Sequence, residues 1–104
     1  MYRIMIVEDD EVIACAVQQS LVSWGMDAFC VQDFSSVLAE FAVKNPQLVL
    51  MDIHLPFFNG FHWCQEIRKV SKVPVIFLSS ASDNMNIIMA VNMGGDDFIA
   101  KPFD

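Results

Sequence analysis

Short apolar runs alternate along the chain with longer segments in which apolar residues recur at helical spacing. The runs predict five strands, which we expect at residues 3–7, 28–31, 48–51, 75–79 and 98–100. The first and third runs are almost wholly apolar, as in central strands that are covered on both faces. Because strands alternate with helical segments, the pattern predicts β-α units and an α/β fold with a doubly wound parallel sheet.

The first helical segment follows the first strand at once. Its apolar residues recur at helical spacing: Ile13, Val17, Leu21 and Trp24. Asp10 and Glu11 open this helix, where acidic side chains complement the positive end of the helix dipole. Gly25 provides a stop signal. We expect Trp24, like Trp63, to lie in the core.

Two further helices are expected before the fourth strand. Asp33 or Ser35 caps the earlier one, which closes at the Asn-Pro pair at 45–46. The later one runs over about 61–70. Its inward residues are expected to be Trp63, Cys64 and Ile67.

The composition describes one domain of 104 residues, 55% of them hydrophobic, which is enough for a sizeable core. The formal net charge is −7, and the six Lys and Arg residues are scattered. Phosphate backbones are bound through clustered Lys and Arg, so this charge balance argues against binding of nucleic acid or an anionic membrane. No apolar run approaches the ~20 residues of a membrane span, and the N-terminus lacks a signal-peptide core. We expect a cytoplasmic location.

The three cysteines, Cys15, Cys30 and Cys64, form an odd number without C-x-x-C spacing. This usage argues against a disulfide framework and a zinc site, and it fits a reducing cytosol. We interpret all three as buried and inert. His54 and His62 do not have the paired Cys/His spacing of a metal site, which favours surface or loop roles over metal ligation.

Polar side chains follow several strands at the point where each strand ends. Glu8 and Asp9 follow the first predicted strand, Asp52 follows the third, Ser79 ends the fourth, and Lys101 follows the fifth. In a doubly wound sheet these carboxyl ends meet at one edge, where ligands bind. At ~5 Å two carboxylates repel by about 3 kcal/mol at an effective dielectric near 20, so the cluster needs compensation.

Three kinds of compensation are open to such a cluster: a raised pKa, a nearby lysine, or a hard divalent cation with oxygen ligands. A solvated helix start is the alternative explanation for Asp10 and Glu11, but it explains Asp52 poorly. Carboxylates, a hydroxyl and an ammonium around one point suggest a magnesium-dependent phosphoryl site. A carboxylate there can itself be the nucleophile and form an aspartyl phosphate.

Five stretches, in this order and spacing, are together highly specific: 6–10 (IVEDD), 51–56 (MDIHLP), 59–60 (NG), Ser79 and 95–103 (GDDFIAKPF). Over essentially its whole length the chain resembles the receiver domain of two-component response regulators. The resemblance implies a flavodoxin-like or CheY-like topology, with five parallel strands in the order 2-1-3-4-5. It also implies a switch that catalyses its own phosphorylation and dephosphorylation without being a turnover enzyme in the usual sense.

The resemblance assigns roles to residues at the expected site. Asp52 is implied as the phosphoacceptor, which attacks the phosphohistidine of a sensor histidine kinase. Mg²⁺ is the one implied cofactor. Its implied ligands are Asp9 directly, Glu8 through water, Asp52, and the backbone carbonyl of His54.

Three residues of the last two strands complete the implied site. Lys101 pairs with the carboxylate and then with the phosphoryl group, while the Ser79 hydroxyl reaches a phosphoryl oxygen. Phe98 matches the aromatic switch residue whose rotamer follows the movement of Ser79. Tyrosine is frequent at that position, so a contact through its hydroxyl is absent here.

The resemblance is closest to OmpR/PhoB-type transcription regulators, of the BceR/GraR kind. Such regulators contact DNA through a separate winged-helix domain, which residues 1–104 do not include. They normally dimerise through their fourth and fifth helices. Asp83 caps the expected fourth helix and Gly94 and Gly95 end it, but its Asn- and Met-rich face lacks the charged residues of the usual dimer contacts.

The chain ends at Asp104, where the family has a fifth helix. We expect a receiver domain truncated before that helix, with the first helix alone on its face of the sheet. Apolar side chains of the first, third or fifth strand that face this helix should then lack part of their cover.

Two other function classes are weighed against the phosphorylation switch. A pseudo-receiver, an interaction module without phosphotransfer, is disfavoured by the intact set of Glu8, Asp9, Asp52, Ser79 and Lys101. A flavin-binding or hydrolytic enzyme is disfavoured because the acidic residues after the first strand repel phosphate unless a metal intervenes. The exposed or half-buried state of Phe57 and Phe58, in the loop after Asp52, is left open.

Overall fold

The computed structural model describes residues 2–80 and 97–101, with side chains as far as residue 78. Its sheet has five parallel strands in the order β2-β1-β3-β4-β5, which confirms the predicted fold class and strand order. Along the chain the described elements are β1 (Arg3–Val7), α1 (Glu11–Ser23), β2 (Asp27–Cys30), α2 (Val37–Lys44), β3 (Leu48–Asp52), α3 (Gly60–Arg68), β4 (Val75–Ser80) and β5 (Asp97–Lys101).

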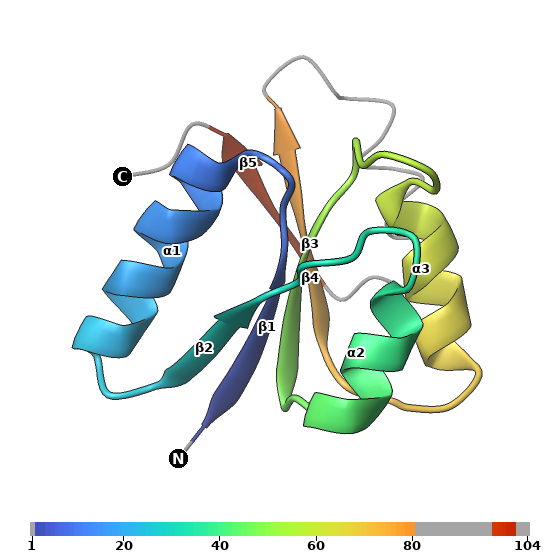
Figure 1. The fold of residues 1–104 in the computed structure, drawn as a ribbon, viewed down its shortest axis with the longest axis horizontal. Coiled ribbons are helices and arrows are strands. Elements are labelled where there is room, and N and C mark those ends of the chain that lie inside the picture. Colours follow the sequence, from blue (N-terminus) through green and yellow to red (C-terminus); the bar gives the residue numbers. More distant parts are fainter. Residues whose placement is uncertain (1, 81–96, 102–104) are drawn as a thin grey trace.

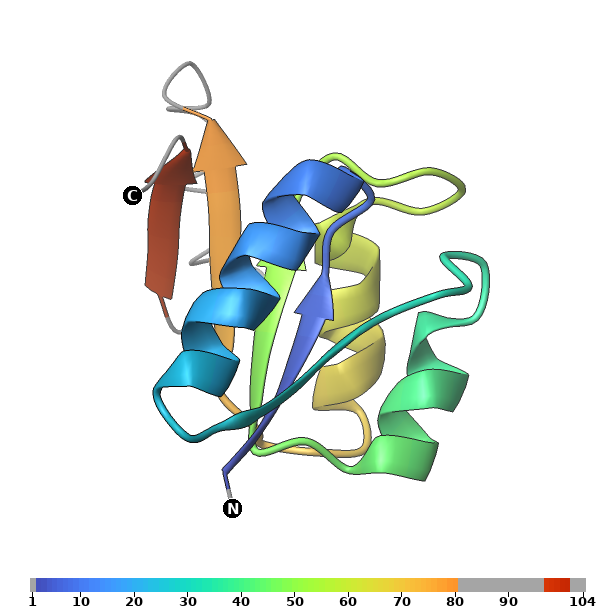
Figure 2. The same ribbon diagram turned by 60° about the vertical axis from the view of Figure 1, so that its left-hand side comes forward.

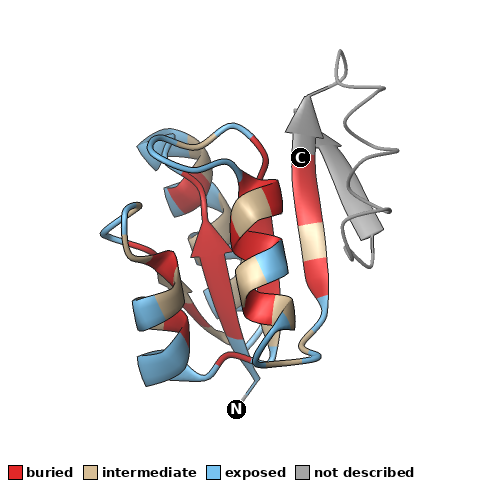
Figure 3. Ribbon diagram, turned by 90° about the vertical axis from the view of Figure 1, so that its right-hand side faces the viewer, coloured by how far each residue is buried: buried red, intermediate tan, exposed pale blue. Residues whose placement is uncertain are grey.

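The helices cover the two faces of the sheet unequally. Among the described elements, α1 lies on one face, and α2 and α3 lie on the other (Figures 1 and 2). Alternate side chains of β1 divide between these faces, as the period of a strand requires: Ile4 and Ile6 pack with α1, and Met5 and Val7 pack on the other side. The central strands are buried, and the outer sides of the helices are exposed (Figure 3).

The face beneath α1 is partly open at its rim. Leu50 and Leu78 are buried there, at 7% and 1% exposure, so they have cover in the structure. Leu48 and Ile76 pack against the same cluster and are only half-buried. Among the strand side chains that the structure describes on this face, partial cover is found at Leu48, Ile76 and Cys30, and the side chains of β5 lie outside the described part.

Helix α1 begins as predicted and ends earlier than predicted. Asp10 is its N-cap, and its carboxylate accepts hydrogen bonds from the backbone N–H groups of Val12 and Ile13. Because the helix ends at Ser23, Trp24 leaves the helical register and is 72% exposed. The prediction that Trp24 lies in the core is wrong, whereas Trp63 is buried at 6% exposure, as expected.

The cysteines differ in burial. Cys64 is fully buried on α3, which confirms the prediction for that residue. Cys30 is half-buried and Cys15 is exposed, so the prediction that all three are buried is wrong. Ala14 is the buried residue of α1. Successive residues of a helix point in different directions, so Cys15 points away from the side that Ala14 buries.

The start of α2 differs from the prediction. Its N-cap is Ser36, and no side chain forms a cap hydrogen bond there, so the prediction of Asp33 or Ser35 as cap is wrong. The Asp33 carboxylate instead accepts hydrogen bonds from the backbone N–H and the hydroxyl of Ser35, at 3.0 and 2.6 Å. These bonds lower the pKa of Asp33. The preceding loop is bound to α2 through Glu40, whose carboxylate accepts the backbone N–H of Asp33 at 2.8 Å.

Helix α3 has the predicted inner face and shorter bounds. Asn59 caps it by accepting the backbone N–H of His62 at 3.0 Å, and the helix ends at Arg68 rather than near residue 70. The predicted inward residues are all buried: Trp63, Cys64 and Ile67. The expected fourth helix, with Asp83, Gly94 and Gly95, lies outside the described residues.

Candidate functional site

Three carboxylates meet at the carboxyl ends of β1 and β3. The parallel register pairs Val7 with Met51, so Glu8 and Asp9 leave β1 beside the end of β3 at Asp52. One carboxylate oxygen from each of Glu8, Asp9 and Asp52 lies within 4.8 Å of the others. The structure therefore brings together the three acidic residues that the sequence placed at this edge.

The cluster is buried on one side and open on the other. Glu8 and Asp52 are each 4% exposed, and Asp9 is exposed. At this distance two carboxylates repel each other by about 3 kcal/mol at an effective dielectric near 20. A Glu8 oxygen accepts the backbone N–H of Asp10 at 3.2 Å, next to the positive N-terminal end of α1.

Gly60 fixes the approach of α3 to the phosphoacceptor candidate. A Cβ atom at position 60 would lie 2.2 Å from the backbone oxygen of Asp52, a separation that real atoms do not adopt. The Gly60 N–H also donates to the carbonyl of Ile53 at 2.9 Å. The missing side chain lets the first turn of α3 pack directly on the end of β3. In the sequence Gly60 stands out only as part of the Asn59-Gly60 motif, which gives no sign of this contact.

The backbones of β4 and β5 bring two more predicted residues to the same edge. Asp52 pairs with Leu78, so Ser79 continues β4 by one residue beyond the level of Asp52. Across the next pairing, Ser79 lies opposite Ala100, and Ser80 lies opposite Lys101. Phe98 lies opposite Phe77, three positions earlier on β5. The side chains of Ser79, Phe98 and Lys101 lie outside the described part of the structure.

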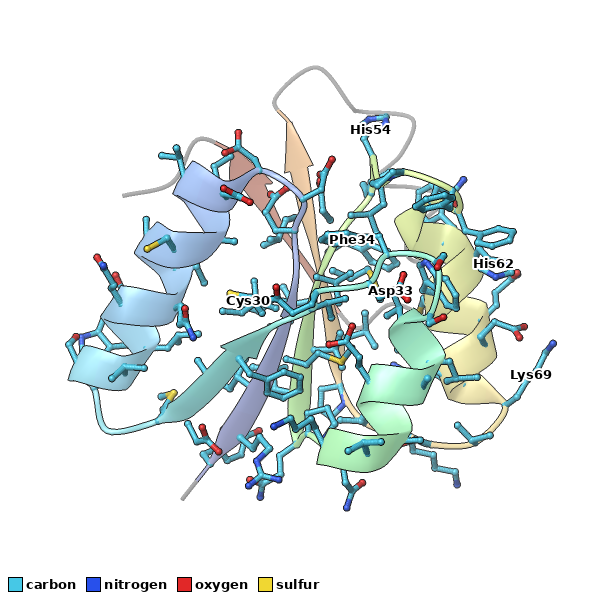
Figure 4. All side chains as sticks on the ribbon, viewed as in Figure 1. Cys30, Asp33, Phe34, His54, His62 and Lys69 are labelled. Atoms are coloured by element: carbon cyan, nitrogen blue, oxygen red, sulfur yellow. The ribbon has the colours of Figure 1, made fainter. Side chains whose placement is uncertain are left out.

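The loop from Ile53 to Asn59 forms one rim of the site. His54 is exposed at the carboxyl edge of the sheet, where Figure 4 labels it. Phe57 is 76% exposed and Phe58 is 46% exposed. The sequence left open whether these side chains are exposed or half-buried, and the structure shows that both are exposed. Phe58 stacks on His62 of α3, with ring centroids 4.3 Å apart.

The donor set suits a hard cation. Carboxylate oxygens are the ligands that Mg²⁺ prefers, usually one or two of them together with water and phosphate oxygens. Two buried carboxylates and one exposed carboxylate provide such a set with an open side for water. The exposed Asp9 lies on this open side, next to the buried Asp52.

The parallel sheet and the acidic cluster beyond its carboxyl ends define a CheY-like α/β domain. The family profile of the response regulator receiver domain matches residues 4–104. The chain therefore belongs to the response regulator receiver domain family.

Named relatives agree with this assignment. BceR of Bacillus subtilis, a sensory transduction protein, is 46% identical over 103 residues, which cover 99% of this chain and 45% of that protein. The response regulator GraR of Staphylococcus haemolyticus is 39% identical over 101 residues, covering 97% of this chain and 45% of GraR. The OmpR/PhoB-type resemblance of the BceR/GraR kind is thus confirmed.

A solved structure gives the same result. The N-terminal domain of the nisin resistance regulator NsrR, a lantibiotic response regulator, has a TM-score of 0.91 and 47% identity. The alignment covers 100% of this chain and 88% of that domain. The chain spans about half the length of the curated relatives it matches. Within the described residues, no helix is long and apolar enough to cross a membrane.

Proposed function

We propose that this domain is a phosphorylation-dependent signalling switch that accepts a phosphoryl group on Asp52. The observation that carries the proposal is the meeting of Glu8, Asp9 and Asp52, with one oxygen of each within 4.8 Å of the others. Asp52 is the one of the three at the end of the central strand β3. Its carboxylate forms the new O–P bond as the donor's bond to phosphorus breaks.

Mg²⁺ is the proposed cofactor. Asp9, Glu8 through water, Asp52 and the backbone carbonyl of His54 would hold it, as in the family. When bound, the cation neutralises charge on the carboxylates and on the incoming phosphoryl oxygens. The chain's own contribution is to hold the carboxylates close together, with Gly60 and Asp10 fixing the backbone next to Asp52 and Glu8.

Residues of the last two strands would bind the phosphoryl group and respond to it. Lys101 pairs with a phosphoryl oxygen, and the Ser79 hydroxyl donates to another. Phe98 then changes rotamer as Ser79 moves. The parallel pairing of β4 and β5 supports these roles, because Ser79 and Lys101 are carried at the edge where β3 ends at Asp52.

The proposed donor is the phosphohistidine of a sensor histidine kinase, from which the P–N bond breaks. The signal would pass to a DNA-binding domain of the full-length regulator, and the receiver would pair with a second copy through its fourth-helix face. This role places the domain in the cytoplasm and in transcription regulation. The similarity to BceR, GraR and NsrR supports this output.

The second candidate is a pseudo-receiver that binds partners without phosphotransfer. It requires a site in which the chemistry has been lost. The close approach of Glu8, Asp9 and Asp52 favours the phosphorylation switch. Carboxylates that lie this close repel one another, and a purely structural contact would gain nothing from that repulsion.

Incubation with acetyl phosphate and Mg²⁺, followed by intact mass measurement, separates the two candidates. We expect the chain to gain the mass of one phosphoryl group, and Asp52→Asn to gain none. Asp10→Asn is the matched control, because Asp10 is the adjacent acidic residue outside the cluster and asparagine retains the cap. Labelling that survives in Asp52→Asn, or an unlabelled native chain, would refute the proposal.

A further inference from the structure

Two of the three cysteines line the same cavity. A cavity of about 280 Å³ lies between α1 and the loop after β2, and both Cys15 and Cys30 line it. Its wall also includes Glu8 and Asp9 of the acidic cluster, so the cavity borders the proposed phosphorylation site. The proposed function uses neither cysteine.

Cys30 directs its sulfur at the turn of α1 that carries Cys15. Figure 4 shows Cys30 on the side of β2 that faces α1. Its Sγ lies 3.8 Å from the backbone oxygen of Ala14 and 3.7 Å from Oε1 of Gln18. A carbonyl oxygen is about 3 Å from the Cα atom of the next residue, so the Cys30 sulfur is within about 7 Å of the Cys15 Cα atom.

The two thiols have different environments. Cys15 is exposed and open to reagents from solvent. Cys30 is half-buried, and burial, followed by the charge of Cys15, raises the pKa of its thiol. An oxidant therefore reaches Cys15 first, and the Cys30 thiol lies next to it within the same cavity.

We propose that Cys15 and Cys30 form an oxidation site, in which hydrogen peroxide converts the two thiols into an intramolecular disulfide. The Cys15 sulfur first attacks one peroxide oxygen, the O–O bond breaks, and Cys15 becomes a sulfenic acid with release of one water. The Cys30 sulfur then attacks the Cys15 sulfur, the S–O bond breaks, and a second water leaves. Two thiols and one hydrogen peroxide thus give one disulfide and two waters.

The bond would join α1 to β2 beside the acidic cluster. Disulfide geometry requires Cβ atoms about 3.8 Å apart. A rotation about χ1 turns the exposed Cys15 sulfur towards the cavity that the residue lines, within picoseconds to nanoseconds. Because this rotation leaves Cβ in place, any remaining gap between the two Cβ atoms must close by a shift of α1 against β2. Cys64 is fully buried on the opposite face of the sheet, so it serves as an internal control within the same chain.

The sequence allows a direct test by mass spectrometry. Reduced protein is treated with hydrogen peroxide, alkylated in denaturant and cut with trypsin. Both cysteines lie in the peptide 4–44, and Cys64 lies in 45–68. We expect peptide 4–44 to lose two hydrogens and take no alkyl group, while the Cys64 peptide is alkylated. Cleavage before Asp27 should leave two peptides joined by the disulfide.

Three variants define the order of reaction. Cys15→Ser should leave Cys30 reduced and alkylatable, whereas Cys30→Ser should stop at a sulfenic acid on Cys15 that dimedone traps. Cys64→Ser should oxidise like the native chain. The proposal is overturned by an alkylatable Cys30 after peroxide treatment of the native chain, by covalent dimers through Cys15, or by a bond that includes Cys64.

Discussion

At the scale of single residues, two backbone positions control the rim of the site. Gly60 allows α3 to touch the backbone of Asp52, where any Cβ atom would collide with the carbonyl oxygen. Phe57 has a φ angle of 69°, in the left-handed region that favours glycine, and its side chain is 76% exposed. Position 60 requires the absence of a side chain, whereas position 57 carries a large side chain on a strained backbone.

Gly60→Ala is expected to slow acetyl phosphate labelling of Asp52 and to lower the free energy of unfolding by about 1–3 kcal/mol, because the new methyl group must displace the end of β3. Labelling time courses and urea denaturation measure the two effects. Gly25→Ala is the matched control: its φ of 87° strains alanine, but no atom lies within 4 Å of the new Cβ. It should lose stability and keep the labelling rate. Equal labelling rates in the two variants would contradict the prediction.

Phe57→Gly is expected to raise the free energy of unfolding by about 0.5–1 kcal/mol. The left-handed backbone costs an L-residue roughly 1–2 kcal/mol, and glycine removes this cost. Part of the gain is lost because glycine makes the unfolded chain more flexible. Phe57→Ala removes the same phenyl ring and keeps the strain, so it should give no such gain. Urea denaturation of both variants makes the comparison. Equal stabilities of the Gly and Ala variants would show that strain at position 57 is unimportant.

At the scale of elements, the loop between β2 and α2 is held by a helix side chain. The Glu40 carboxylate of α2 accepts the backbone N–H groups of Gln32 and Asp33, at 3.1 and 2.8 Å. Gln32 and Phe34 of this loop line the cavity beside Glu8 and Asp9. The loop thus gets its position from a carboxylate seven or eight residues later in the chain.

Glu40→Ala is expected to lower the free energy of unfolding by about 1.5–3 kcal/mol, because hydrogen bonds to a charged acceptor contribute about that much and two N–H groups lose their partner. Glu40→Gln keeps one oxygen acceptor and should lose less. Glu66→Ala, which removes an exposed contact with Lys69, should change stability little. Chemical denaturation ranks the three variants. A loss in Glu40→Ala no larger than that in Glu66→Ala would contradict the role of Glu40.

At the scale of the whole molecule, the sheet concentrates negative charge at its carboxyl edge. The chain has a net charge of −7, and three of its carboxylates lie within 4.8 Å of one another there. Repulsion among these carboxylates contributes a loss of stability at the edge where we propose that Mg²⁺ binds. A cation that binds only the folded state reverses this loss and shifts the unfolding equilibrium.

Mg²⁺ is expected to raise the melting temperature, with about 2.7 kcal/mol of stabilisation at a hundred times its dissociation constant. Asp9→Asn should remove most of this response and should also stabilise the metal-free chain, since it removes one charge from the cluster. Asp10→Asn should respond like the native chain. Thermal melts with and without saturating Mg²⁺ decide the matter, and an unchanged native midpoint would mean that the cluster holds no metal.

The sequence by itself determined the order of strands and helices and the place where the acidic residues meet. Periodic apolar residues define elements locally, and the carboxyl ends of parallel strands share an edge, so Glu8, Asp9 and Asp52 could be placed together from their positions alone. Only the tertiary structure decided the exposure of Trp24 and Cys15, the contact of Gly60 with Asp52, and the cavity shared by Cys15 and Cys30. Each of these depends on where a helix ends and how closely it packs on the sheet, and the hydrophobic pattern of one segment contains no information about its neighbours' surfaces.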